Sequence, residues 1–247
     1  MTMKNTHSAL ILTVALVATT GTAGATQLGN SGFDLSSNVA VTTDYTFRGI
    51  SQTNEGPALQ GGFDLSHESG FYVGNWNSNV EFGDASLESD IYGGWAGSFN
   101  DVSVDVGAVY FFYPDTGADG SDDEFDYGEV YGTLGYDFGF ASVSAGVDLT
   151  NEFFAESGDA QHYRGSISVP ITDVVSLGAN TGYQVIDEND TFGTPDYWHY
   201  GVSVSASFAE NYTATLSGVG NDLDDGECFG GSDLCDERVE FMLSASF

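Results

Sequence analysis

The sequence predicts an all-β fold, a transmembrane antiparallel up-and-down β-barrel of about 12 strands that follows a cleaved signal peptide. Three observations predict it. They are an apolar leader at the N-terminus, a period-two alternation of apolar and polar residues, and connections that alternate between short and long. The composition agrees, because the 247 residues include 33 Gly, 14% are aromatic and only 17% are charged. Long helices need many Ala, Leu, Glu and Lys residues and few Gly.

Residues 1–25 have the three parts of a signal peptide. Lys4 precedes an apolar stretch at 9–18, and Ala23-Gly24-Ala25 forms a small-residue cleavage site. The apolar stretch is too short for a spanning helix, which needs about 20 apolar residues. We therefore expect export to the bacterial outer membrane of a mature chain, residues 26–247, that forms one barrel domain and inserts by strands.

Alternation predicts twelve strands in the mature chain. In the first of them, Val39, Val41, Tyr45 and Phe47 have one parity and mostly polar residues have the other. Strands of about ten residues are long for a globular sheet and match a tilted crossing of a membrane. The predicted strands are residues 38–50, 58–66, 71–80, 87–97, 102–113, 125–136, 140–150, 160–169, 174–185, 197–208, 212–219 and 237–247.

The connections between these strands alternate in length. Every second one has three or four residues, and the others have six to seventeen. Long loops at one rim and short turns at the other are typical of an outer-membrane barrel, whereas Greek-key sandwiches mix lengths at both ends. The predicted long loops are residues 51–57, 81–86, 114–124, 151–159, 186–196 and 220–236.

The two faces of the strands differ in residue type. Apolar and aromatic residues dominate one face, which in a barrel of this size contacts lipid, and polar residues dominate the face toward a wet lumen. We expect the lumen charges to set the electric field that a passing solute feels. The alternative is a plugged, hydrogen-bonded interior that conducts nothing. The predicted lumen charges are Asp44, Arg48, Asp64, Glu88, Asp90, Asp105, Glu129, Asp148, Arg164, Arg238 and Glu240.

The last eleven residues end on an aromatic residue. Val239, Phe241, Leu243 and Ala245 alternate with other residues, and the chain stops at Phe247. This pattern resembles the C-terminal β-signal by which the barrel-assembly machinery recognises outer-membrane proteins. We therefore interpret Phe247 as an assembly signal. An ordinary closing strand is the alternative.

Two sequence blocks resemble a known family. Residues 37–82 and 86–99, most strongly in TDYTFRGISQ, PALQGG and SHESGFYVG, are similar to the opening of the TorF family of proteobacterial outer-membrane proteins. The resemblance covers roughly the first third of the chain. It implies an outer-membrane barrel that acts as a channel, and it implies no catalytic or binding residues.

Cys228 and Cys235 lie in the last long loop, separated by six residues. Two cysteines in an exported chain predict a disulfide that closes a small surface loop. Metal ligation is the weaker alternative, because zinc sites normally use closer cysteine pairs and further ligands. The acid-rich segments 115–124, 187–190 and 221–227 do not have the EF-hand spacing, so we interpret them as a solvated rim or as weak sites for Ca²⁺ or Mg²⁺.

The charge and the motifs limit the function. With 4 Lys and Arg against 37 Asp and Glu, the chain does not suit nucleic acid. No nucleophile signature such as G-x-S-x-G is present, which argues against an enzyme.

The sequence thus predicts a porin-like channel, without a cofactor, for passive and cation-preferring diffusion of small hydrophilic solutes. The expected partners are outer-membrane lipid, the barrel-assembly machinery, and small hydrophilic solutes or cations. The alternatives are a non-conducting structural or adhesive barrel with cation-binding acidic loops, and an outer-membrane hydrolase.

Overall fold

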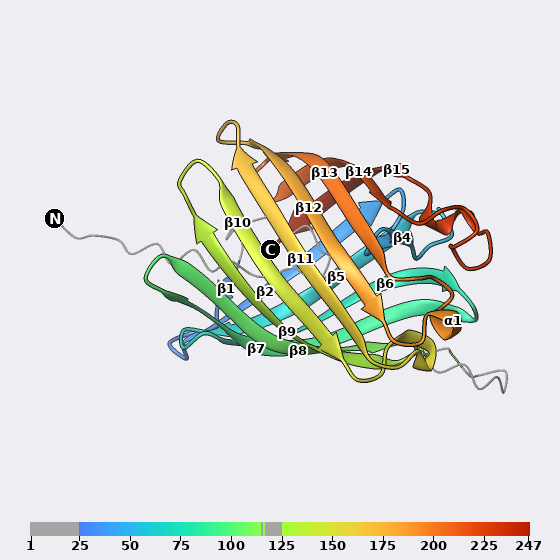
Figure 1. The fold of residues 1–247 in the computed structure, drawn as a ribbon. Coiled ribbons are helices and arrows are strands. Elements are labelled where there is room, and N and C mark those ends of the chain that lie inside the picture. The colour runs from blue at the N-terminus through green and yellow to red at the C-terminus, as the bar shows by residue number, and fades with distance from the viewer. Residues whose placement is uncertain (1–24, 115, 117–124) are drawn as a thin grey trace.

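The computed structural model describes residues 25–114, 116 and 125–247. Twelve of the thirteen strands of its main sheet form a closed antiparallel barrel (Figure 1), in which β15 pairs with β2. The predicted fold class is confirmed. The barrel strands are β2 (Phe33–Thr42), β5 (Ala58–His67), β6 (Phe71–Phe82), β7 (Ala85–Phe99), β8 (Val102–Phe112), β9 (Tyr127–Asp137), β10 (Ser142–Thr150), β11 (Ala160–Pro170), β12 (Val175–Ile186), β13 (Tyr197–Phe208), β14 (Tyr212–Asn221) and β15 (Arg238–Ser246).

Several short elements accompany the barrel. They are β1 (Thr26–Gln27), which pairs with β2, the hairpin strands β3 (Thr46–Phe47) and β4 (Ile50–Ser51), the helix α1 (Asn189–Phe192), and the 3-10 turns η1 (Phe154–Glu156) and η2 (Asp233–Cys235). Among the described residues, no helix is both long and apolar enough to cross a membrane. Nearly all of the predicted signal peptide and most of the acidic segment 115–124 lie outside the described residues.

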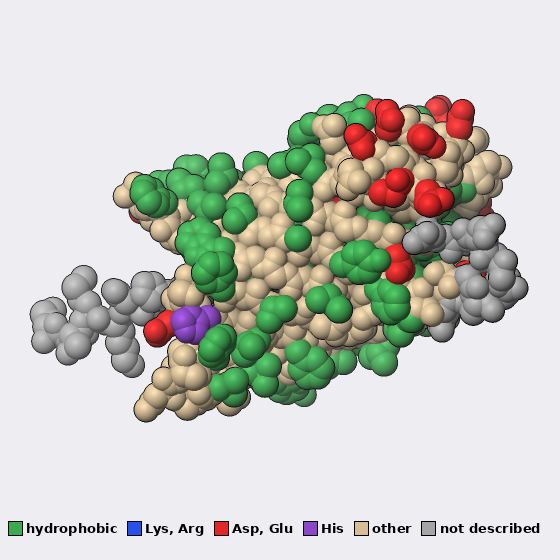
Figure 2. All heavy atoms as spheres, turned by 90° about the horizontal axis from the view of Figure 1, so that it is seen from below, with side chains coloured by type: hydrophobic (Ala, Val, Ile, Leu, Met, Phe, Trp, Pro, Cys, Tyr) green, Lys and Arg blue, Asp and Glu red, His purple; other side chains and the backbone are tan. Residues whose placement is uncertain are grey.

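The outer wall carries the apolar face of the strands. The side chains of Leu59, Phe63 and Val202, for example, are 60%, 62% and 62% exposed. Such exposure suits a lipid solvent, because outer-membrane barrels direct an apolar band outward. Figure 2 shows hydrophobic side chains over the wall and acidic side chains gathered at the end of the barrel that carries the long loops.

One predicted long loop is wrong. Instead of a loop over residues 81–86, β6 and β7 continue pairing until Phe82 faces Ala85, and only Gly83 and Asp84 form the turn. Gly83 has a φ of 53°, a left-handed conformation that glycine adopts without the usual steric cost. Four of the other predicted long loops, near residues 51–57, 151–159, 186–196 and 220–236, are present, and the opposite rim has only short turns. Most of the predicted loop 114–124 lies outside the described residues.

The first predicted strand, 38–50, is also wrong in its second half. Strand β2 ends at Thr42, and the chain then turns into the barrel as a segment that we call the inner hairpin, residues 43–51, made of β3, β4 and the Arg48-Gly49 turn. Arg48 and Gly49 have φ values of 50° and 79°, as a two-residue hairpin turn with the right twist requires. Asp44 and Arg48 therefore reach the interior from a loop and not from the wall.

An apolar core fills the interior at the loop end. Aromatic rings pack against each other in this core. Phe111 stacks on Tyr127 with ring centroids 4.5 Å apart, and Tyr45 lies edge-on to Trp76 with ring centroids 5.3 Å apart. Such packing excludes water as the core of a soluble domain does. The buried core residues are Tyr45, Ala58, Trp76, Val80, Ala85, Val109, Phe111, Tyr113, Phe125, Tyr127, Phe153, Ala160 and Ile186.

The chain end closes the sheet at Phe247. Its N–H donates to the Ser37 carbonyl at 2.8 Å, and its own carbonyl accepts from the Ser37 N–H at 2.8 Å. We expect Phe247→Ala to reduce the assembled, heat-modifiable fraction several-fold, and Phe247→Tyr to preserve it, because the aromatic ring is proposed to be the recognised group. Gel mobility of unheated membrane extracts measures this. Equal assembly of the alanine variant and the native chain would make Phe247 an ordinary strand residue.

Candidate functional site

The inner hairpin crosses the barrel interior, and Arg48 at its turn reaches the far wall. The Arg48 guanidinium donates to both oxygens of Glu129 on β9, at 2.7 and 2.9 Å, and to Gln184 Oε1 on β12 at 2.8 Å. Asp148 on β10 lies 3.9 Å away. The guanidinium also stacks near Phe47, 4.6 Å from the ring centroid. Because the hairpin follows β2, these contacts connect β2 with β9 and β12 across the barrel interior.

The other two arginines are also held by carboxylates. Arg164 Nε donates to Asp148 Oδ2 at 2.9 Å, which links the neighbouring strands β10 and β11. Arg238 Nη1 donates to Asp44 Oδ2 at 2.6 Å, which links β15 to the inner hairpin. Asp44 also accepts from the hydroxyls of Ser51 and Thr53, both at 2.8 Å. Each of the three interior arginines thus has one closest acid, and Arg238 also lies 3.4 Å from Glu55.

Five interior acids have no arginine partner in the described part of the chain, and tyrosines bind three of them. Tyr45 and Tyr113 both donate to Glu88 at 2.7 Å, Tyr72 donates to Asp105 at 2.7 Å, and Tyr92 donates to Asp64 at 2.5 Å. Burial and the nearby Glu88 carboxylate raise the pKa of the Tyr45 and Tyr113 phenols, which keeps both as hydrogen-bond donors. The five acids are Asp64, Glu88, Asp90, Asp105 and Glu240.

Asp90 and Glu240 are the least satisfied of these acids. Each has one buried carboxylate oxygen without a hydrogen-bond partner, Asp90 Oδ1 and Glu240 Oε1. The structure places the eleven predicted lumen residues on the interior side, where most are buried or bound to other interior residues. Eight acids against three arginines give a formal sum of −5. Because the arginines are bound in pairs, the negative charge is concentrated at the five remaining acids.

A histidine pair extends the polar interior. His162 Nδ1 lies 2.8 Å from Asp148 Oδ2, and His162 Nε2 lies 2.7 Å from His199 Nε2. Gly182 on the strand between them makes room for this contact, since a side-chain carbon at that position would collide with both imidazoles. The pair completes a chain of hydrogen bonds along the wall from Arg164 through Asp148 to His199.

The tyrosine partners are functional residues that the sequence analysis missed. Tyr92 has the same parity as Asp90 on the same strand, β7, so its inward direction could be read from the sequence. The contacts of the tyrosines could not, because Tyr72 and Asp105 come from strands that are not neighbours in the sheet.

Cys228 and Cys235 form a disulfide in the structure, and their sulfurs are joined at 2.07 Å. The bond packs against the inner hairpin, because both cysteines cluster with Ile50 and Tyr197. Asn221 Nδ2 donates to the carbonyls of Gly49 and Cys235, at 2.8 and 2.9 Å. The loop that contains the disulfide therefore covers the hairpin, and it is more than a small surface ring.

We expect the disulfide to be oxidised and shielded in the native protein. Cys228 and Cys235 are only 1% and 7% exposed, so a membrane-impermeant maleimide should label neither until the protein is both denatured and reduced. Mass spectrometry of the loop peptide, with and without reductant, measures this. Labelling of the folded, unreduced protein would contradict the pairing. The chain-entropy model limits the stabilisation by so short a ring to about 2–3 kcal/mol.

The acidic loops do not provide a metal site within the part of the chain that the structure describes. No group of three or more His, Cys, Asp or Glu residues there is arranged to hold a metal ion. Cation binding at the rim therefore stays a prediction.

Solved structures similar to this barrel are porins and channels. The KdgM porin aligns with a TM-score of 0.58 and 10% identity, over 86% of this chain and 98% of that chain. The NanC porin aligns at 0.56 and 11%, over 86% and 98%. An outer membrane channel from Pseudomonas putida F1 aligns at 0.54 and 10%, over 90% and 100%. At such identities the likeness shows the fold alone, a porin-like β-barrel.

No curated protein matches the sequence. The resemblance to the TorF family stays an interpretation of the sequence, because the family model that matches has another name. That model is described as "Bacterial protein of unknown function (Gcw_chp)" and matches residues 26–247. The chain belongs to this family, Gcw_chp, whose function is unknown.

Proposed function

We propose that the protein is an outer-membrane channel for passive diffusion of small hydrophilic solutes and that it prefers cations. The observation that carries this proposal is the set of five interior acids without arginine partners, Asp64, Glu88, Asp90, Asp105 and Glu240, inside a barrel that resembles porins. Fixed negative charge along a narrow path attracts cations and repels anions.

The inner hairpin limits conduction in this proposal. It lies across the interior and contacts β9 and β12 through Arg48, and the aromatic core fills the space around it. The observed arrangement is then a closed or weakly conducting state. Movement of the hairpin away from Glu129 and Gln184 opens a path along the polar wall.

Export and assembly complete the proposal. Residues 1–25 act as a cleaved signal peptide, the barrel-assembly machinery recognises the strand that ends at Phe247, and outer-membrane lipid surrounds the apolar wall. The similar structures are channels and not enzymes, which fits a passive role.

A second candidate is a non-conducting structural barrel. The packed core at the loop end favours it, because residues such as Phe111 and Tyr113 are 1% and 4% exposed. Single-channel recording of the purified protein in planar bilayers separates the two candidates. Discrete current steps support the channel, whereas silence of both the native protein and a variant with an undocked hairpin supports the structural barrel.

A further inference from the structure

The outward face of β6 interrupts the apolar wall. Its successive outward residues are Phe71, Val73, Asn75, Asn77 and Asn79, so the strand changes from apolar to polar near its middle. On the inward side of the same half of β6, Trp76 and Val80 are apolar, because they are buried in the core around the inner hairpin. Three asparagine amides therefore lie on the lipid side of the sheet. We call the outward residues Asn75, Asn77, Asn79 and Ser89 the asparagine face.

Hydrogen bonds along the sheet use most of the amide N–H groups of this face. Asn77 Nδ2 donates to Asn75 Oδ1 at 2.6 Å and to the Gly61 carbonyl at 3.3 Å. Asn75 Nδ2 donates to Ser89 Oγ at 3.2 Å and to the Asp90 carbonyl at 3.0 Å. Within the described residues, the Asn77 carbonyl oxygen accepts no hydrogen bond and the Ser89 hydroxyl donates none. The face thus offers an unused acceptor at Asn77 and an unused donor at Ser89, which lie opposite each other on β6 and β7.

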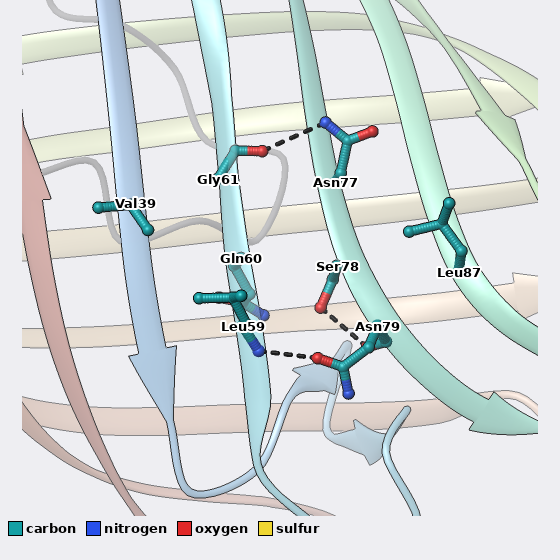
Figure 3. Close-up of a pocket in the computed structure, with 8 residues that line it drawn as sticks. All are labelled: Val39, Leu59, Gln60, Gly61, Asn77, Ser78, Asn79 and Leu87. Atoms are coloured by element: carbon teal, nitrogen blue, oxygen red, sulfur yellow. Dashed lines mark hydrogen bonds between the residues drawn. The ribbon is translucent and has the colours of Figure 1, made fainter.

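The asparagine face borders a hollow in the wall. The hollow has a volume of about 280 Å³ and lies over Gly61, between the apolar side chains of Val39, Leu59 and Leu87 (Figure 3). Gly61 is required here, because a side-chain carbon would lie 2.7 Å from the Asn38 carbonyl oxygen. Small residues on a lipid-facing surface allow another protein backbone to approach closely.

Acyl chains cannot satisfy this surface. In hydrocarbon an unpaired donor or acceptor has no water to bind, so its burial against lipid is unfavourable. A surface that carries both an unused donor and an unused acceptor is complementary to its own copy. Across a twofold axis, Ser89 of each copy can meet Asn77 of the other, and the two contacts are equivalent.

We propose that the asparagine face binds the same face of a second copy of this chain and forms a twofold dimer in the membrane. Leu59 and Leu87, which flank the hollow, supply the apolar contact of each copy with the other. This interface involves β5, β6 and β7 and leaves the barrel interior unchanged, so the proposal is independent of conduction.

The test measures association of the mature chain in phosphatidylcholine vesicles. Residues 26–247 contain no lysine, so one dye can be attached to the N-terminal amine of each chain. Stepwise photobleaching at decreasing protein-to-lipid ratios then gives the dimer fraction. We expect the native chain to dimerise and the N75L/N77L variant to need at least about tenfold more protein per lipid for the same dimer fraction.

Two further variants keep the test decisive. Thr181→Leu also replaces an outward polar residue by leucine, but on β12, six strands away around the barrel, and should leave dimerisation unchanged. Ser89→Ala removes the unused donor, together with the Oγ that accepts from Asn75 Nδ2, at little change in shape. It should weaken the dimer, and it remains informative if N75L/N77L fails to assemble. A native chain that stays monomeric at every ratio overturns the proposal. So does dimerisation that none of the asparagine-face variants changes, because the interface then lies elsewhere.

Discussion

Arg48→Ala is expected to raise the mean single-channel current several-fold above that of the native protein. The substitution leaves Glu129 buried without its cation, and breaking a buried ion pair in this way costs about 3–5 kcal/mol. Because this pair joins the inner hairpin to β9, the cost falls on the docked hairpin. Each 1.4 kcal/mol is a factor of ten in population, so the population ratio of undocked to docked hairpin should rise by about two to three and a half orders of magnitude. Planar-bilayer recordings measure the open probability and the conductance.

Arg164→Ala is the matched control. It removes the same charge and takes the closer arginine from a carboxylate, Asp148, but the hydrogen bonds of Arg164 go to Asp148 and Thr133 on the wall strands and not to the hairpin. Asp148 keeps its longer contact with Arg48, at 3.9 Å. Its current should stay near the native value, and heat modifiability should show that both variants are assembled. Equal currents for Arg48→Ala and the native protein, with both barrels intact, would show that the hairpin does not limit conduction.

The architecture could be predicted from the sequence because lipid imposes a strict pattern on a strand. On β8, Val102, Val104 and Val106 must face the membrane, so Asp105 must face the interior. The same rule gave the direction of every predicted charge on a wall strand. Loop lengths then distinguished the two rims, because the long connections all lie at one rim, although the β6–β7 turn at that rim is short.

The inner hairpin could not be predicted in this way. Tyr45 and Phe47 continue the alternation of β2, and alternation is the same for a strand in the wall and for a hairpin inside the barrel. Only the Arg48-Gly49 dipeptide distinguishes a hairpin from a continuing wall strand. A turn there is favourable because Glu129 and Gln184, both far away in sequence, bind the Arg48 guanidinium. The outward direction of Asn75 and Asn77 could not be predicted for a related reason. Their outward direction follows from the burial of Trp76 against the hairpin.

Asp105→Asn and Asp64→Asn together are expected to lower the cation preference of the channel. Both acids face the interior and bind only tyrosine hydroxyls among the described residues, so neither forms an ion pair with an arginine there. A fixed charge about 5 Å from the path changes the energy of a monovalent ion by about 0.8 kcal/mol in water, or about fourfold in local concentration. Reversal potentials across a KCl gradient should therefore favour K⁺ in the native protein and move toward zero in the double variant.

The salt dependence and a control variant make this result specific. The Debye length falls from about 10 Å at 0.1 M to about 3 Å at 1 M salt, so the native preference should also shrink as the mean salt concentration rises. Asp173→Asn removes a charge from an exposed turn outside the interior and should leave the reversal potential unchanged. An anion-selective native channel, or a preference that neither salt nor the double variant alters, would mean that the interior acids do not set the field. Ion selectivity would then have to come from the loops at the rim, where substitution of Asp222, Asp224 and Asp225 would reduce it instead.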